Sequence, residues 1–353
     1  MKMWLSWVIV VMFGLGAAAN AQTVPAGDKD ALRVYFVDVE GGQATLFVTP
    51  EHESLLIDTG YPGNDGRDAD RIVAMAKRAG VTKIDNVLIT HYHRDHAGGV
   101  PQLVERIPVG RFIDHGPSME PGDVDPNTKL AWDAYEKVMA EKHYERLTVH
   151  PGDVLPIKGM HAEVVSANGF VILKLLNGGG AGKPNAACAK SPMKPVEATE
   201  NDRSVGLMIT FGKLRILDLG DLTWAKERAL ECPEDKLGKV DVYIASHHGL
   251  ARSNSPALVY GVAPRVVVIG NGPTKGAEPS AWEIMQKSPR IEAIWQLHTA
   301  ENNDGAHNVP DERIADLRGN DAAHGLELTA RKDGTLAVTN ERTGQTVEYP
   351  AAK

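Results

Sequence analysis

The chain has 353 residues, 42% of them hydrophobic and 24% charged, and its 38 Lys and Arg against 46 Asp and Glu give a formal charge of −8. This apolar content excludes intrinsic disorder, and the acidic balance argues against a protein that covers long nucleic acids with cations. The only cysteines, Cys188 and Cys232, are too few for a four-thiolate zinc site or a disulfide framework. These two cysteines either form one disulfide or remain two unrelated free thiols.

The first 21 residues have the pattern of a signal peptide. Lys2 supplies a basic start, an apolar stretch follows, and Ala19-Asn20-Ala21 is an A-x-A cleavage site. Cleavage after Ala21 leaves a flexible leader at 22–31 and an exported protein, periplasmic or secreted. No later apolar run is long enough to span a membrane. The alternative is an uncleaved membrane anchor.

Strand-like runs and helical spacing alternate along the rest of the chain. Strands are predicted at 32–39, 44–49, 54–60, 84–90, 149–157, 161–167, 204–211, 213–221, 241–249, 265–272 and 291–298, and helices at 68–78, 130–143, 223–231 and 280–287. Asp333-Gly334 signals a final hairpin. The Gly/Pro-rich stretch 177–195 indicates a surface insertion or lid loop. We therefore expect one α/β domain at 32–350, with helices outside two central sheets.

One polar loop carries a high density of metal-binding side chains. The buried strand at 84–90 ends in HYHRDHAGG, which places His91, His93, Asp95 and His96 within six residues. His91 and His93, two apart in an extended turn, can point the same way, whereas Asp95 and His96 face a neighbouring position. The spacing therefore predicts that one loop serves two adjacent metal sites.

HYHRDHAGG resembles the H-x-H-x-D-H signature of the metallo-β-lactamase superfamily, whose fold is a four-layer αββα sandwich. The resemblance implies that Asp58 of LLIDTG steadies the metal loop from outside and that Asp221 of LDLGD bridges two metals. ASHHG then supplies the last ligand, and we favour His247 over His248 because His247 comes first after the strand. FVDVEGGQA and the tandem HHG resemble the competence-protein (ComEC-type) branch.

The chain departs from these patterns in two places. The third histidine that most hydrolases of the superfamily supply to the first metal has no recognisable counterpart, so His91 and His93 leave that site under-liganded. The corresponding ENDRS segment resembles the ComEC-type replacement, which makes Asn201 a candidate weak ligand or substrate contact. Glu278-Pro279 stands where that branch carries His-Pro, and this weakens any transfer of substrate from it.

The resemblance implies a metal-dependent hydrolase. Nitrogen and oxygen ligands without a thiolate fit one or two Zn²⁺ ions, with Mn²⁺ or Fe²⁺ as alternatives. A bound metal lowers the pKa of its water toward ~7 and so supplies hydroxide at neutral pH. Asp95 and Asp221 are then the catalytic carboxylates, with Asp95 orienting the nucleophile and shuttling its proton. Two further histidines are candidates for reaching the metal cleft: His298 and His307.

The ComEC-type likeness favours a phosphodiester or a related ester, either a small molecule or a component of the cell envelope. The acidic charge and the lack of a basic strip argue against long nucleic acids. Two alternatives stay open: hydrolysis of a lactone or β-lactam, and a non-catalytic, metal-stabilised binding protein of the envelope. The sequence gives no indication of the oligomeric state.

Overall fold

The computed structural model describes residues 28–120, 124–303, 305–319 and 321–352. The predicted signal peptide, 1–21, and residues 22–27 of the predicted leader lie outside these ranges. Within the ranges, no helix combines the length and the apolar character that crossing a membrane requires.

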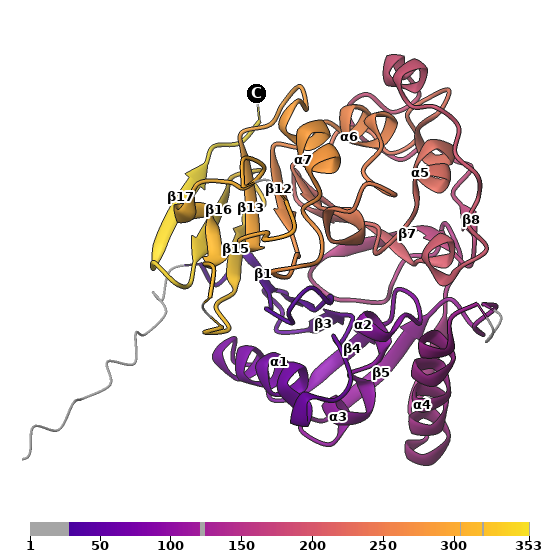
Figure 1. Ribbon diagram of the computed structural model, residues 1–353, viewed down its shortest axis with the longest axis vertical. Coiled ribbons are helices and arrows are strands. Elements are labelled where there is room, and N and C mark those ends of the chain that lie inside the picture. Colours follow the sequence, from indigo (N-terminus) through magenta and orange to yellow (C-terminus); the bar gives the residue numbers. More distant parts are fainter. Residues whose placement is uncertain (1–27, 121–123, 304, 320, 353) are drawn as a thin grey trace, which may run out of the picture.

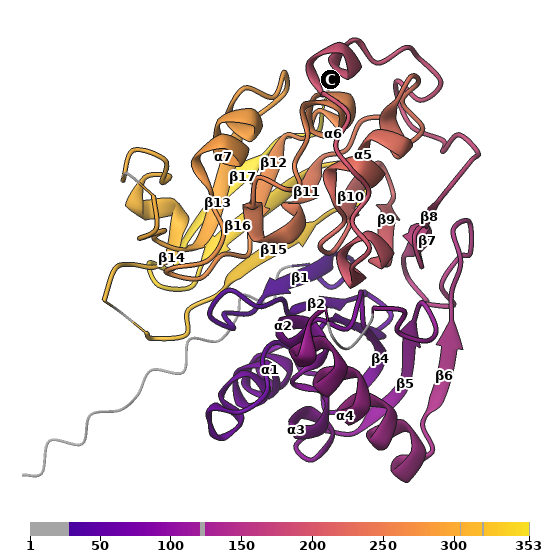
Figure 2. The ribbon, with the colours of Figure 1, turned by 45° about the vertical axis from the view of Figure 1, so that its right-hand side comes forward.

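Two sheets stacked face to face form the centre of the molecule (Figures 1 and 2). In the described residues the first sheet has nine strands, in the spatial order β17 (Gln345–Tyr349), β16 (Leu336–Asn340), β15 (Leu326–Ala330), β1 (Leu32–Phe36), β2 (Thr45–Val48), β3 (Ser54–Ile57), β4 (Ile84–Leu88), β5 (Val109–Asp114) and β6 (Glu145–Thr148). The second has eight, in the order β14 (Ile314–Asp316), β13 (Ala293–His298), β12 (Val266–Ile269), β11 (Val242–Ile244), β10 (Leu214–Asp218), β9 (Gly206–Phe211), β7 (His161–Ala167) and β8 (Phe170–Val171).

Helices cover the outer face of each sheet (Figure 2). The first sheet carries α1 (Arg67–Arg78), α2 (Arg94–Ala97), α3 (Val100–Val104) and α4 (Pro126–Lys142), and the second carries α5 (Trp224–Glu231), α6 (Pro256–Val262) and α7 (Pro279–Gln286). Short 3₁₀ turns complete the described elements: η1 (Asn64–Gly66), η2 (Ala186–Lys190), η3 (Glu200–Arg203), η4 (Ser246–Gly249) and η5 (Asp311–Arg313).

Strand residues alternate between the layers, because successive side chains of a strand point to opposite faces. In β1, Val34 and Phe36 join the apolar cluster between the two sheets, whereas Tyr35 packs in the cluster beneath α1, with Ile72. A third cluster fills the space between the second sheet and its helices, where Val259 of α6 is fully buried. Three apolar clusters separating four layers confirm the predicted αββα sandwich.

Most predicted elements are present with boundaries shifted by a few residues, including the hairpin at Asp333-Gly334, which joins β15 to β16. The strand predicted at 149–157 is wrong. Its only β-bridge joins Val154 to Glu163, and a few backbone hydrogen bonds of Gly152, Asp153 and Leu155 reach β7 without forming a strand ladder. The two prolines of VHPGDVLPI lack the N–H groups that a strand ladder uses, which explains the failure. The extent of the domain, 32–350, stays a prediction.

The 177–195 insertion is fastened to the second sheet's helices. A disulfide joins Cys188 in η2 to Cys232, which directly follows α5, with the Cα atoms 5.8 Å apart. The side-chain amide of Asn185 donates to the carbonyl oxygen of Ala257 in α6 at 2.8 Å. The structure therefore selects the disulfide from the two alternatives that the sequence leaves open.

Removing the disulfide should destabilise the fold without changing it. The cysteines lie 44 positions apart, and a loop of that length is worth about 4 kcal/mol in the chain-entropy model. We expect Cys188→Ser/Cys232→Ser to lower the free energy of unfolding by about 2–4 kcal/mol in urea titrations, with an unchanged far-ultraviolet circular dichroism spectrum. Reduced wild type should match the variant. Equal urea midpoints for oxidised wild type and the variant would contradict this.

Candidate metal centre

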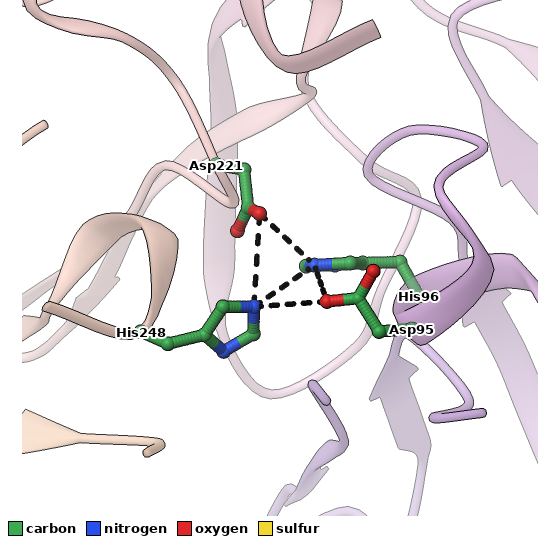
Figure 3. Close-up of side chains that lie close together, drawn as sticks. All are labelled: Asp95, His96, Asp221 and His248. Atoms are coloured by element: carbon green, nitrogen blue, oxygen red, sulfur yellow. Dashed lines mark hydrogen bonds and ion pairs between the residues drawn. The ribbon is translucent and has the colours of Figure 1, made fainter. Parts of the chain in front are cut away.

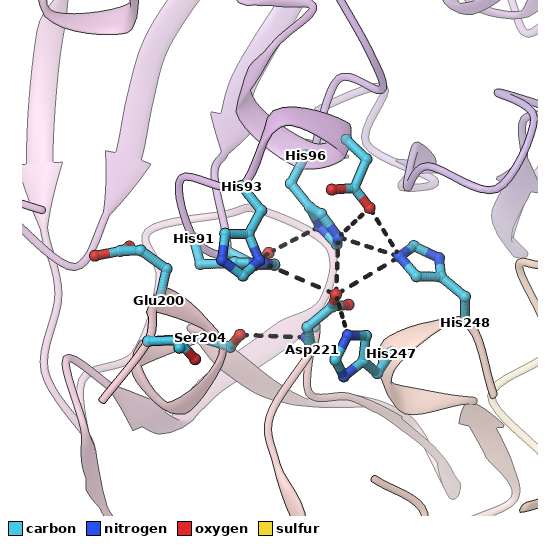
Figure 4. Close-up of polar contacts among 12 residues, drawn as sticks. His91, His93, His96, Glu200, Ser204, Asp221, His247 and His248 are labelled. Carbon is cyan, nitrogen blue, oxygen red and sulfur yellow. Dashed lines mark hydrogen bonds and ion pairs between the residues drawn. The ribbon is translucent and has the colours of Figure 1, made fainter. Parts of the chain in front are cut away.

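The predicted metal-binding side chains converge where the carboxyl ends of strands from both sheets meet (Figure 4). The loop after β4 carries two of the histidines and leads into α2, which carries the neighbouring Asp-His pair. Asp221 follows β10, and the tandem histidines lie in η4, after the parallel strand β11. The group consists of His91, His93, Asp95, His96, Asp221, His247 and His248.

Four buried donor atoms form a compact group (Figure 3). The Nε2 atoms of His96 and His248 lie 3.3 Å apart. Each lies 3.2–3.3 Å from Oδ2 of Asp95 and 3.3–3.6 Å from Oδ2 of Asp221. A tetrahedral zinc ion with ligand bonds of about 2.0–2.1 Å spaces its ligands by about 3.3–3.4 Å. The donor set and its spacing therefore fit one divalent cation.

A second group of donors adjoins the first and shares Asp221 with it. Nε2 of His91 lies 3.0 Å from Nδ1 of His93 and 3.8 Å from Oδ2 of Asp221. These three residues form a further candidate cation group. No third histidine joins this group among the described residues, and the nearby His115 pairs through Nε2 with the buried Glu200 at 3.0 Å. This second group thus has three protein donors: His91, His93 and Asp221.

Asp58 lies outside the donor groups and orients His96. Its Oδ2 is 2.7 Å from Nδ1 of His96, so that this nitrogen donates to the carboxylate and Nε2 faces the donor group. The backbone N–H and the hydroxyl of Thr90 donate to the two Asp58 oxygens at 2.8 and 2.7 Å. This is the outer position that the family resemblance implies for Asp58.

Glu120 orients His93 in the way that Asp58 orients His96. No sequence pattern indicated Glu120. Its Oε2 lies 3.4 Å from Nε2 of His93, which leaves Nδ1 of His93 facing His91. The backbone N–H of Glu200 donates to Glu120 at 2.7 Å and fixes the carboxylate. Because Glu120 belongs to the loop between β5 and α4, only the tertiary fold brings it to the metal loop.

The two tandem histidines have different positions in the structure, and the one in the four-donor group is His248, whereas the sequence favoured His247. His248 belongs to the four-donor group, and its Nδ1 lies 3.0 Å from the carbonyl oxygen of Gly270. His247 contacts Asp221 at 3.3 Å but joins neither donor group. Both residues have positive φ, 56° and 54°, so η4 turns the chain sharply after β11. The four-donor group therefore includes His248 and not His247, while the preference for His247, which also reaches Asp221, stays a prediction.

The loop 271–278 brings a lysine to the centre. The ammonium of Lys275 contacts Oδ2 of Asp95 and lies 3.4 Å from the hydroxyl of Tyr61. Glu278, which replaces the expected histidine, accepts a hydrogen bond from the backbone N–H of Ala251 at 2.7 Å and so secures the tandem-histidine loop. The sequence pattern showed the replacement at Glu278 but gave no signal for Lys275.

The remaining candidates lie outside both donor groups. Asn201 in η3 is buried, and its Oδ1 has no hydrogen-bond partner among the described residues. Nε2 of His298 lies 2.6 Å from Oδ1 of Asp38, in a separate cluster. Nε2 of His307 lies 3.3 Å from the Glu283 carboxylate.

Electrostatics at the centre favour positive charge. Burial alone would raise the pKa of the Asp221 carboxyl, but the imidazoles around it, His247 foremost, hold that pKa well below its usual range. Burial would likewise lower the pKa of His96, but the carboxylates of Asp221 and Asp95 raise it well above its usual range. Without a cation, a proton on the His96 imidazole is favoured by these carboxylates, and a bound metal ion would displace that proton.

The comparisons with known proteins agree with this geometry. A family-level match to the "Metallo-beta-lactamase superfamily" covers residues 37–168, which contain the HYHRDHAGG loop. Recombination protein 2 of Haemophilus influenzae is 23% identical over 266 residues, which are 75% of this chain and 27% of that protein. ComE operon protein 3 of Bacillus subtilis is 24% identical over 284 residues, 76% of this chain and 32% of that protein. The chain thus spans about a third or less of these two curated relatives.

Among solved structures, CmlA, a diiron β-hydroxylase from Streptomyces venezuelae, matches with a TM-score of 0.37 and 16% identity, over 75% of this chain and 48% of CmlA. That likeness is too weak to carry an argument. The family-level match, the two relatives and the four-layer sandwich confirm the resemblance predicted from the sequence: this chain is similar to the metallo-β-lactamase superfamily and to its ComEC-type branch.

Proposed function

We propose that the chain is an exported, metal-dependent hydrolase that acts on a phosphodiester or a related ester. One observation carries the proposal: a buried four-donor group with tetrahedral spacing shares the Asp221 carboxylate with an adjacent three-donor group. Two such groups joined by one carboxylate suit a pair of cations acting on a single substrate.

The residues that would hold the cations follow from the two groups. Asp95, His96, Asp221 and His248 would hold one ion, and His91, His93 and Asp221 the other. Zn²⁺ suits these borderline donors, with Mn²⁺ and Fe²⁺ as alternatives. Catalytic zinc sites commonly use three protein ligands, which is the number in the second set. When bound, the ions supply Lewis acidity and an activated water at neutral pH.

The chain's own residues support an anionic substrate. Lys275 places an ammonium against Asp95, and its side chain remains 30% exposed. A positive charge that is reachable from solvent beside the donor groups would attract and orient a phosphodiester or carboxylate. Asp95 would orient the attacking water and accept its proton, while Asp58 and Glu120 hold His96 and His93 in place.

Export is supported by two independent features. The first 21 residues have the signal-peptide pattern, and the Cys188–Cys232 disulfide is of a kind that persists in oxidising compartments. We therefore propose a periplasmic or secreted location. Because the chain spans only part of the curated relatives, their activities are not transferred to it. Lactone or β-lactam hydrolysis and non-catalytic envelope binding are the alternatives that activity measurements separate.

Hydrolysis should depend on Asp221. We expect the Zn²⁺- or Mn²⁺-loaded wild type to hydrolyse bis-p-nitrophenyl phosphate, and Asp221→Ala to lower kcat/KM by about 10³-fold or more, since the variant loses the carboxylate common to both groups. The release of p-nitrophenolate measures this, with lactone and cephalosporin substrates in parallel. Asp133→Ala, in the exposed Lys129–Asp133 pair of α4, is the control. A fully active Asp221→Ala would show that the site is misassigned.

The tandem histidines should differ in metal binding. Because His248 alone of the two joins the four-donor group, we expect His248→Ala to lose about one equivalent of Zn²⁺ and His247→Ala to keep the wild-type content, measured by atomic emission after dialysis against buffered Zn²⁺. The reverse order would restore the preference for His247 that the sequence suggested.

The two outer carboxylates should act on different ions. Losing such a partner typically costs 10–100-fold in metal affinity. We therefore expect Asp58→Asn to weaken binding at the four-donor group and Glu120→Gln to weaken it at the three-donor group, each by about 10–100-fold in competition with a chromophoric chelator. Asp133→Asn serves as the matched carboxylate-to-amide control. Wild-type affinities in both variants would count against the orienting roles.

A further inference from the structure

An open cavity of about 1070 Å³ lies outside the metal centre. It is lined by the 177–195 insertion, Asp235, Lys239, the end of α6 and the segment after α7. Figure 2 shows α6 and the insertion at the upper end of the molecule, away from α2, which carries Asp95 and His96. The family resemblance assigns no role to this region.

The cavity and the metal centre lie at opposite ends of the same strands. Lys239, which lines the cavity, precedes β11, whereas His248 follows it. Arg290, also in the lining, precedes β13, which runs parallel to β12, and β12 to β11. A ligand in the cavity therefore binds without touching the donor groups.

The lining is strongly cationic in a chain whose net charge is −8. Its charged side chains are one carboxylate, Asp235, and five cations: Lys183, Lys190, Lys239, Lys287 and Arg290. Asp235 already accepts a hydrogen bond from the backbone N–H of Gly238 at 2.6 Å. Lys287 and Arg290 lie beside carboxylates outside the lining, Glu283 and Asp241. Three lysines against one carboxylate still favour an anionic occupant.

Two of these lysines have no counter-charge. In the part of the chain that the structure describes, neither Lys183 nor Lys190 forms an ion pair, and both are exposed. By contrast, Lys287 pairs with Glu283 at 2.9 Å.

The wall that carries Lys183 and Lys190 is held in place before any ligand binds. The carbonyl oxygen of Lys183 accepts from the backbone N–H of Asp235 at 3.0 Å, and the backbone N–H of Asn185 donates to the Pro233 carbonyl at 2.9 Å. The Cys188–Cys232 disulfide follows within the next turn. A preorganised wall reduces the entropy lost on binding.

We propose that this cavity binds a small organic polyphosphate. The volume of about 1070 Å³ lies slightly above the usual range for small-molecule sites, about 300–1000 Å³. Lysines bind phosphate as point charges, and several separate ammonium groups suit a ligand with several phosphates better than one with a single carboxylate. The site is independent of the hydrolase activity and would serve to anchor or regulate the protein through an anionic metabolite.

Calorimetric titration with tripolyphosphate at low ionic strength tests the proposal. The metal-loaded wild type should bind one equivalent at this cavity, beside any phosphate taken up at the metals, and Lys183→Gln/Lys190→Gln should weaken the cavity step by at least about 10-fold, since two charge-assisted contacts are lost. Lys137→Gln/Lys142→Gln, two exposed lysines of α4, is the charge-matched control and should bind as wild type. Asp221→Ala should also keep the binding, because the cavity does not involve the metal donors.

Several results would overturn the proposal: no binding by the wild type, equal affinities in the two double-lysine variants, or loss of binding in Asp221→Ala, which would place the phosphate at the metals. Binding of long heparin chains without binding of tripolyphosphate would also overturn it, since the surface would then recognise a macromolecular polyanion. Thermal unfolding of the variants checks that each remains folded, so that weaker binding reports on the cavity.

Discussion

The buried carboxylate of Asp221 is the interaction on which the site depends. One oxygen of this residue lies 3.3–3.8 Å from nitrogens of four imidazoles, His91, His96, His247 and His248. Asp221 follows a strand of the second sheet, whereas His91 and His96 follow a strand of the first. Burying a carboxylate is costly unless it is paired. Loops from both sheets therefore meet at Asp221, where the buried carboxylate requires a neighbouring positive charge.

The surrounding residues fix where that charge resides. Asp58 and Glu120 each take one ring nitrogen of a histidine and thereby direct the other nitrogen toward a donor group. Neither carboxylate is itself mobile, since backbone N–H groups of Thr90 and Glu200 hold them. Lys275 approaches Asp95 from the 271–278 loop and adds a charge that a substrate can reach. The negative charge of the buried carboxylates thus positions the histidines, the outer carboxylates that orient them, and the lysine on the solvent-facing side of the site.

The sequence predicted the parts of this arrangement that are local. HYHRDHAGG places its four ligands within one loop after a buried strand, and its resemblance to the metallo-β-lactamase superfamily implied the αββα sandwich. Glu120 and Lys275 could not be predicted, because loops distant in the sequence deliver them through tertiary contacts. The spacing did not reveal the left-handed turn in η4, which brings both His247 and His248 to Asp221. The 149–157 strand failed because its prolines interrupt hydrogen bonding.

Anomalous X-ray scattering at the zinc edge, on crystals of the Zn²⁺-loaded protein, tests the central claim most directly. The account predicts two peaks, one among Asp95, His96, Asp221 and His248 and one beside His91 and His93, with the carboxylate of Asp221 contacting both. Zinc bound at any place that does not involve Asp221, or no ordered zinc at all, would contradict it.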